Sequence, residues 1–180
     1  TQLVELGTLH ESADEPISSL ATTGEGFVGA GTSLFSWTTA GEELARAALP
    51  AVATSVAVRG DAVYVLAGKL LRFTLPDLRA SGQWKHAKGV TSELDVDDEG
   101  GRALVLRDNN QVELIDLVRR KSLADWTRSS RKIKALSARF SRAGTVLVVS
   151  DEDMRLSRVK DTTGRITGEE FMLGGYSNGP

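Results

Sequence analysis

Cysteine is missing from this chain, and histidine and proline are scarce. Its 180 residues include no cysteine, two histidines and four prolines. Without cysteine, the chain cannot form disulfide bonds, a thiolate nucleophile or a cysteine-based zinc site. Four prolines beside 18 glycines exclude collagen-like and proline-rich low-complexity proteins. A chain without cysteine suits the reducing cytosol, so a cytoplasmic location is expected.

The sequence also lacks long apolar runs and a dominant charge. No stretch approaches 18 apolar residues, so no membrane-spanning helix is predicted. The formal net charge of −2 excludes a globally basic nucleic-acid binder, although a local basic patch stays compatible with it. The first residues show no charged segment followed by an apolar one, so no signal peptide is expected. With 41% hydrophobic and 26% charged residues, the composition is that of a globular domain.

The apolar residues occur in short runs that are typical of β-strands. Each run has four or so residues, is rich in β-branched or aromatic side chains, and most are bounded by Gly, Asp or Asn. The runs are 56–58, 63–66, 103–106, 112–115 and 146–149. Because they are continuous rather than alternating, both faces of each sheet should be covered, as in stacked sheets. The sequence therefore predicts an all-β fold.

An internal repeat organises these strands. Glycine turns at Gly24, Gly60, Gly100 and Gly144 each precede an apolar strand, at steps of 36, 40 and 44 residues. Each unit reads as a strand, a glycine turn, an apolar strand, a polar turn, another apolar strand and a charged strand. Four strands in roughly 40 residues is the spacing of β-propeller blades. One such sheet cannot bury both faces alone, so the units should stack around an axis.

The repeat sets the expected boundaries of the blades. They are about 17–50, 51–89, 90–130 and 131–173, with 1–16 as a strand of an adjoining or closing blade and 174–180 as a flexible tail. Residues 41–50 have good helix propensity, but the repeat requires a strand there. Two arrangements remain open, a closed ring of four blades and an incomplete part of a larger propeller. In the second arrangement, another chain or another part of a longer protein completes the ring.

One unit resembles a known family. Residues 111–126 contain Val112-Glu113-Leu114-Ile115-Asp116-Leu117, a basic turn and then Leu123, which resembles the third and fourth strands of a WD-repeat blade. Residues 71–79 form a weaker copy. The chain departs from the family because no Trp-Asp dipeptide ends a third strand and no Gly-His pair precedes a first strand. The resemblance covers roughly 17–173. It implies a WD-repeat-like β-propeller that presents a rim and a channel face to protein partners.

The clearest charge feature is a basic stretch with a tryptophan inside it. The candidate interaction patch consists of Arg119, Arg120, Lys121, Trp126, Arg128, Arg131, Lys132 and Lys134. Such a stretch could bind an anionic partner, either an acidic protein or a nucleic acid, through its cations and an aromatic ring. The alternative is an outer strand and a loop whose long charged side chains are solvated and protect a sheet edge.

Candidate catalytic and metal-binding residues are few. Residues 95–100 begin like a calcium loop, but the twelfth position is Leu106, where a calcium loop needs a bidentate glutamate. We interpret this segment as a solvated acidic turn. His10 and His86 lie in loop-like segments without a nucleophile turn beside them. No catalytic residue, cofactor or metal is therefore predicted.

The expected function follows from the repeat and from this scarcity of reactive groups. We expect a non-catalytic propeller that serves as a protein–protein interaction scaffold or sensor, within a larger protein or a multi-chain assembly. The alternative is a propeller enzyme or a small-ligand-binding domain, in which polar residues from several blades converge on the central channel.

Overall fold

All regular structure in the described part of the chain is β-strand. The computed structural model describes residues 15–84, 91–107, 112–126, 135–141, 146–150, 155–159 and 171–172. Each regular element in these ranges is a strand, which confirms the all-β prediction. Within the same ranges, nothing forms a helix of the length and apolarity needed to cross a membrane.

The strands form antiparallel sheets of four, and each sheet uses strands that are consecutive in sequence. The first sheet contains β1 (Ser19–Thr22), β2 (Gly26–Ala30), β3 (Ser33–Thr38) and β4 (Glu43–Ala48). The second contains β5 (Ser55–Arg59), β6 (Ala62–Leu66), β7 (Leu70–Thr74) and β8 (Arg79–Trp84). The third contains β9 (Thr91–Val96), β10 (Arg102–Arg107), β11 (Val112–Asp116) and β12 (Lys121–Trp126). The fourth contains β13 (Ala135–Phe140), β14 (Val146–Ser150), β15 (Arg155–Val159) and β16 (Phe171–Met172).

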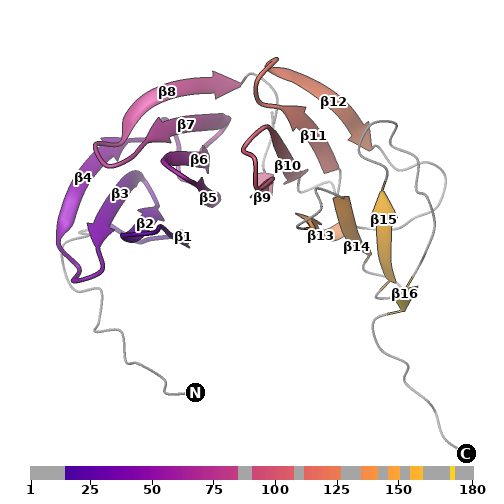
Figure 1. Ribbon diagram of the computed structural model, residues 1–180, viewed down its shortest axis with the longest axis horizontal. Coiled ribbons are helices and arrows are strands. Elements are labelled where there is room, and N and C mark those ends of the chain that lie inside the picture. Colours follow the sequence, from indigo (N-terminus) through magenta and orange to yellow (C-terminus); the bar gives the residue numbers. More distant parts are fainter. Residues whose placement is uncertain are drawn as a thin grey trace, which may run out of the picture.

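The four described sheets follow one another around an open arc (Figure 1). The first strand of each sheet, β1, β5, β9 or β13, lies on the inside of the arc, and β4, β8 and β12 lie on the outside. The first and the fourth sheets stand at the two ends of the arc. Neighbouring sheets meet mainly through their inner strands: β5 contacts β1 and β2, β9 contacts β5 and β6, and β13 contacts β9 and β10.

The hydrophobic core lies between the sheets, as the continuous apolar runs predict. In β6, Val63 and Val65 belong to the core shared with the first sheet, whereas Tyr64 and Leu66 belong to the core shared with the third. All four side chains are buried. Each contributes about 1.5–3 kcal/mol through removal of apolar surface from water. A third cluster joins the third and fourth sheets and includes Leu104.

Glycine is required where the inner strand turns into the second strand. Gly60 and Gly100 have φ angles of 56° and 66°. This left-handed conformation costs an L-residue with a side chain roughly 1–2 kcal/mol, and glycine adopts it freely. Both glycines lie in the turns that the repeat assigned to them. The segment at 41–50 contains β4, so the preference for a strand over a helix there is also confirmed.

Several sequence predictions lie outside the described residues. These are the adjoining or closing strand, for which no residue before 15 is described, the tail at 174–180 and the fourth glycine turn at Gly144. Each sheet lies within one of the four expected units.

One interpretation needs correction, because the acidic turn at 95–100 is not wholly solvated. Asp97 is buried, and its carboxylate accepts hydrogen bonds from the amides of Gly101 and Arg102 at 2.8 and 3.0 Å.

Candidate functional site

The inner strands present backbone amides that no strand of their own sheet can satisfy. An innermost strand pairs on one side only, so every second N–H group points away from its sheet. A partly buried N–H needs an acceptor from elsewhere in the protein. In this chain, side-chain oxygens of the preceding sheet supply the acceptors.

The same hydrogen bond recurs at three successive junctions. The Ser19 hydroxyl of β1 accepts from the Val56 amide of β5 at 3.0 Å. The Ser55 hydroxyl of β5 accepts from the Leu94 amide of β9 at 3.2 Å. At the third junction, the carboxylate of Glu93 accepts from the amide of Ala138 in β13 at 3.3 Å. Asp95 accepts from the next inner strand in the same way, and Arg59 and Arg139 pair with the two acids. We call this set the inner-strand polar row, which consists of Ser19, Ser55, Arg59, Glu93, Asp95 and Arg139.

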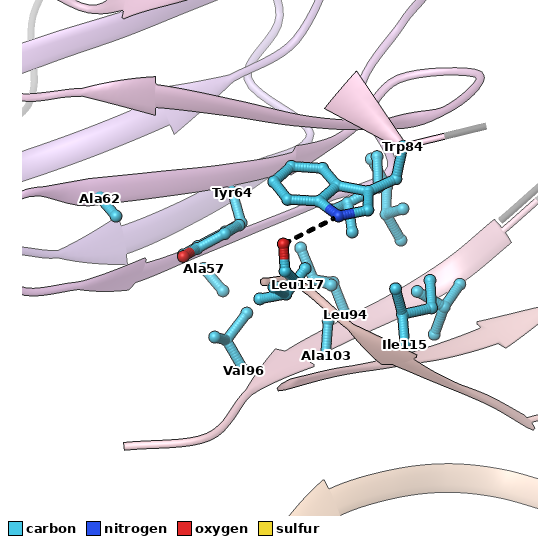
Figure 2. Close-up of a cluster of buried hydrophobic side chains, with 12 residues drawn as sticks. Ala57, Ala62, Tyr64, Trp84, Leu94, Val96, Ala103, Ile115 and Leu117 are labelled. Carbon is cyan, nitrogen blue, oxygen red and sulfur yellow. Dashed lines mark hydrogen bonds between the residues drawn. The ribbon is translucent and has the colours of Figure 1, made fainter. Parts of the chain in front are cut away.

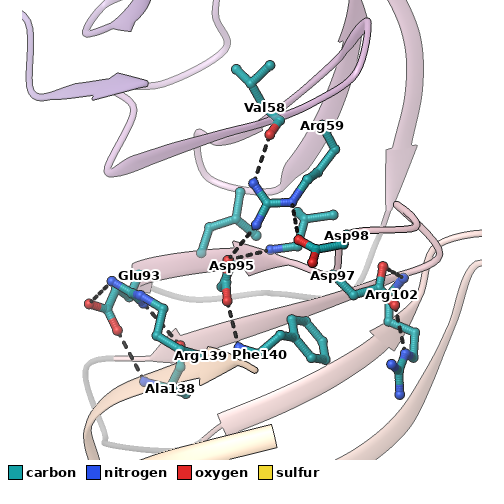
Figure 3. A network of polar contacts seen from close by, with 12 residues as sticks. Val58, Arg59, Glu93, Asp95, Asp97, Asp98, Arg102, Ala138, Arg139 and Phe140 are labelled. Carbon is teal, nitrogen blue, oxygen red and sulfur yellow. Dashed lines mark hydrogen bonds and ion pairs between the residues drawn. The ribbon is translucent and has the colours of Figure 1, made fainter. Parts of the chain in front are cut away.

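Asp95 connects three sheets at once (Figure 3). One carboxylate oxygen accepts from the Phe140 amide of β13 at 2.7 Å. The other accepts from the Arg59 guanidinium of β5 at 3.3 Å and from the Val96 amide of its own strand at 3.0 Å. The Asp95 side chain is 14% exposed and that of Arg59 is 34% exposed, so water screens this ion pair only in part. The β9 strand is thereby joined to both neighbouring inner strands.

Glu93 makes a second connection of the same kind. The Arg139 guanidinium lies 2.7 Å from one of its oxygens, and the Ser137 hydroxyl donates to the other at 3.0 Å. Arg139 also donates to the Ala138 carbonyl at 3.0 Å, just as Arg59 donates to the Val58 carbonyl at 2.9 Å. The two arginines therefore make the same contact with their own strands, on β5 and on β13.

The carboxylates of β9 and of the turn after it hold parts of the fold together. Glu93, Asp95 and Asp97 each accept from a guanidinium and from at least one backbone amide. These charge-assisted hydrogen bonds hold the carboxylates in fixed positions within the framework. In the described part of the chain, no group of three or more His, Asp or Glu side chains could hold a metal ion.

The sequence contains a signal for this row that the repeat analysis missed. A serine or glutamate stands at the same position of every inner strand, Ser19, Ser55, Glu93 and Ser137, at spacings of 36, 38 and 44 residues. A single polar residue before an apolar one is unremarkable in any one strand. Only the register of four aligned units gives it meaning.

Part of the predicted interaction patch lies within the described structure. Arg119 and Arg120 occupy the turn between β11 and β12, and Lys121 begins β12, the outer strand of the third sheet. Arg119 is 73% exposed, although its guanidinium is 3.5 Å from the Asp116 carboxylate. The Arg120 guanidinium lies 6.0 Å from the centre of the Trp84 ring. Trp126 ends β12, and Arg128, Arg131, Lys132 and Lys134 lie outside the described residues.

The segment that resembles a WD-repeat blade forms β11, a turn and β12. The Asp116 carboxylate accepts from the Arg119 amide at 2.7 Å, which closes the turn before the outer strand. The next residue, Leu117, belongs to the core between the second and third sheets. Its carbonyl accepts a hydrogen bond from the indole of Trp84 at 3.3 Å (Figure 2). The pattern thus combines a turn-closing carboxylate with a core contact to the preceding sheet.

Trp84 and Tyr64 pack together inside that interface. Their ring centres are 6.2 Å apart, and both side chains are buried. Burial raises the pKa of the Tyr64 phenol, and the nearby Arg72 guanidinium partly opposes the shift. Trp37 is likewise buried and stacks on Phe35 with ring centres 5.3 Å apart. These two tryptophans therefore serve packing rather than an exposed aromatic surface.

Comparison with known proteins gives a fold but no family. No protein-family model matches the chain, and no curated protein matches it. Among solved structures, the chain is similar to BamB from Moraxella catarrhalis, with a TM-score of 0.63 at 17% sequence identity. The match covers 83% of this chain and 46% of that one, so this chain corresponds to about half the length of BamB. The chain thus has an all-β, β-propeller-like fold.

Proposed function

We propose that this chain is a non-catalytic, WD-repeat-like propeller portion that acts as a protein-interaction scaffold. The observation that carries the proposal is the inner-strand polar row. In a propeller, ligands and substrates of a central channel would meet the inner strands. Here the acids on those strands are engaged with arginines and with backbone amides of adjoining strands, so they support the framework.

The stacked sheets suit a scaffold for a second reason. Their buried apolar interfaces hold exposed turns and rims in fixed relative positions, and binding to such a rigid surface orders few additional side chains. Protein partners are the class that this surface fits, including a partner that completes the ring of sheets. The cytoplasmic location expected from the sequence stays a prediction.

The basic turn is the surface on which a partner can be sought first. Arg119 and Lys121 are exposed at one rim of the third sheet. An acidic protein segment would be attracted to them, and the attraction would weaken with salt. A nucleic acid would show a steeper salt dependence, because binding releases condensed counterions.

The test compares proteins captured by the immobilised wild-type chain with those captured by a charge-reversed variant. The variant carries Arg119→Glu and Lys121→Glu. The control carries Arg79→Glu, which reverses an 80% exposed arginine at the matching turn of the second sheet. A scaffold should retain a stoichiometric partner, and that partner should be lost only with the first variant if the basic turn binds it. Failure of the folded wild-type chain to retain any protein stoichiometrically would refute the scaffold function.

A further inference from the structure

One position of the inner strands differs sharply between the first sheet and the others. The residues that follow the recurring serine or glutamate are Leu20, Val56, Leu94 and Ala138. Val56, Leu94 and Ala138 are 7%, 5% and 3% exposed, because each packs against the preceding sheet. Leu20, with no preceding sheet in the described structure, is 51% exposed.

The backbone at this position shows the same difference. The amides of Val56, Leu94 and Ala138 each donate to a side chain of the preceding inner strand. Among the described residues, no side chain accepts from the amide of Leu20. Leu20 pairs with Gly29 as Val56 pairs with Val65, so its amide also points away from β2. The inner edge of the first sheet thus has an exposed leucine and an N–H group, both arranged for a neighbouring sheet.

Two positions beside Leu20 on the first sheet are covered by side chains of that sheet. The ring of Trp37 lies so close over Gly29 that a Cβ there would be 2.7 Å from it. The guanidinium of Arg46 lies 4.5 Å from the centre of the Phe35 ring. At the inner strand, Leu20 stays exposed, and Ile17, just before β1, is 37% exposed. The junctions between the described sheets run through the same inner strands.

The chain itself carries the acceptor that this edge lacks. A matching neighbour needs a hydroxyl or carboxylate at the position of Ser19, Ser55 and Glu93. Ser137 occupies that position in β13, where it pairs with Val149 as Ser55 pairs with Leu66. Its oxygen can accept one hydrogen bond while it donates to Glu93. Within one chain, however, β13 and β1 belong to opposite ends of the arc (Figure 1).

Size indicates which neighbour fits. The similar propeller-like structure is about twice as long as the part that this chain matches, since the match covers 46% of it. A second half of equal length is therefore what completes such a ring. A second copy related by a two-fold axis would form both missing junctions with the same pair of surfaces, and the ring would close.

We propose that two copies of this chain associate head to tail into one ring of eight sheets, four from each copy. The fourth sheet of one copy packs against the first sheet of the other. At each of the two junctions, the Ser137 hydroxyl accepts from the amide of the partner's Leu20, whose side chain becomes buried. This inference rests on the proposed propeller scaffold and names the partner that completes it.

The experiment measures the molar mass of the full chain in solution by light scattering across a concentration series. We expect about twice the 19.3 kDa of one chain. Leu20→Asp should yield a monomer, because it places a charge in both junctions. The control is Val118→Asp, which changes an 80% exposed valine in the turn between β11 and β12 of the third sheet, away from both junctions, and should leave the dimer intact. Ser137→Ala should raise the dimer dissociation constant by about 10–100-fold, since two hydrogen bonds are lost.

Three results would overturn the proposal. They are a folded wild-type monomer at every concentration, open-ended oligomers, and a dimer that survives Leu20→Asp. Circular dichroism and urea unfolding of each variant separate a lost junction from a lost fold. A folded wild-type monomer that still captures a partner in the preceding experiment would reject the second copy and leave the scaffold function standing.

Discussion

The connection made by Asp95 offers a direct test of the inner-strand polar row. Replacing Asp95 with alanine removes the acceptor of the Phe140 amide and one of the two acidic partners of Arg59, the other being Asp98. A partly buried amide left without an acceptor costs about 1–3 kcal/mol. Loss of an ion pair whose arginine is 34% exposed adds roughly 0.5–1 kcal/mol. Asp95→Ala should therefore lower the free energy of unfolding by about 2–4 kcal/mol.

Two further variants separate the contributions. Asp95→Asn keeps an oxygen that can accept from Phe140 but removes the charge, so we expect a loss of about 1 kcal/mol. Asp77→Ala removes an exposed acid that pairs with Arg79 at 3.0 Å on the surface of the second sheet. That change should cost under about 0.5 kcal/mol.

The measurement is equilibrium urea unfolding, followed by circular dichroism. A shift of the midpoint at constant m-value reports stability alone. The reasoning would be refuted if Asp95→Ala cost no more than the surface control. It would also fail if Asp95→Asn lowered the free energy of unfolding as much as Asp95→Ala, because the side-chain oxygen that accepts from the Phe140 amide would then contribute nothing.

Three other predictions concern the core, the turns and pH. Trp84→Ala should cost about 3–5 kcal/mol in urea unfolding and Trp84→Phe clearly less, because phenylalanine refills most of the buried volume. Gly26→Ala would place a Cβ 1.9 Å from the Trp37 carbonyl oxygen, so it should lower the free energy of unfolding by about 2 kcal/mol or more. In the control Gly24→Ala, the Cβ meets nothing within 4 Å, and the change should be under about 0.5 kcal/mol. Similar urea midpoints for the two variants would contradict this packing. The pKa of the Tyr64 phenol is raised in the folded chain, so the unfolded chain loses this proton first as the pH rises. The contribution of Tyr64 to the free energy of unfolding is therefore complete below the ordinary pKa of 10.0 and is lost as the pH rises above it. Urea midpoints between about pH 9 and 11 should thus fall more steeply for the wild type than for Tyr64→Phe, and parallel curves would count against the effect.

Much of the framework follows from residue order alone. Val63-Tyr64-Val65-Leu66 is apolar without alternation, which requires cover on both faces, and the structure buries the four side chains in two different interfaces. The glycines at 60 and 100 mark turns because only glycine adopts their backbone angles without strain. These features are local, so a single sequence contains them.

Other features depend on residues far apart in the chain. The acids at 95 and 97 suggested a solvated turn, yet Asp97 is buried against its own turn and Asp95 bonds to β5 and β13. Nothing local to Asp95 indicates Phe140 as its partner, 45 residues away. The basic stretch shows the opposite case. Charged residues that are close in the sequence form one binding surface only if the fold places their side chains on the same face.

The sequence by itself determined the strands, the glycine turns and the repeat, because backbone angles and apolar periodicity are properties of neighbouring residues. Only the tertiary structure decided how the repeats are joined. An amide at the free edge of an inner strand has no partner in its own sheet, so its acceptor comes from the next sheet in space. For this reason Ser19, Ser55 and Glu93 acquire a shared role only when the four sheets stand side by side around the arc.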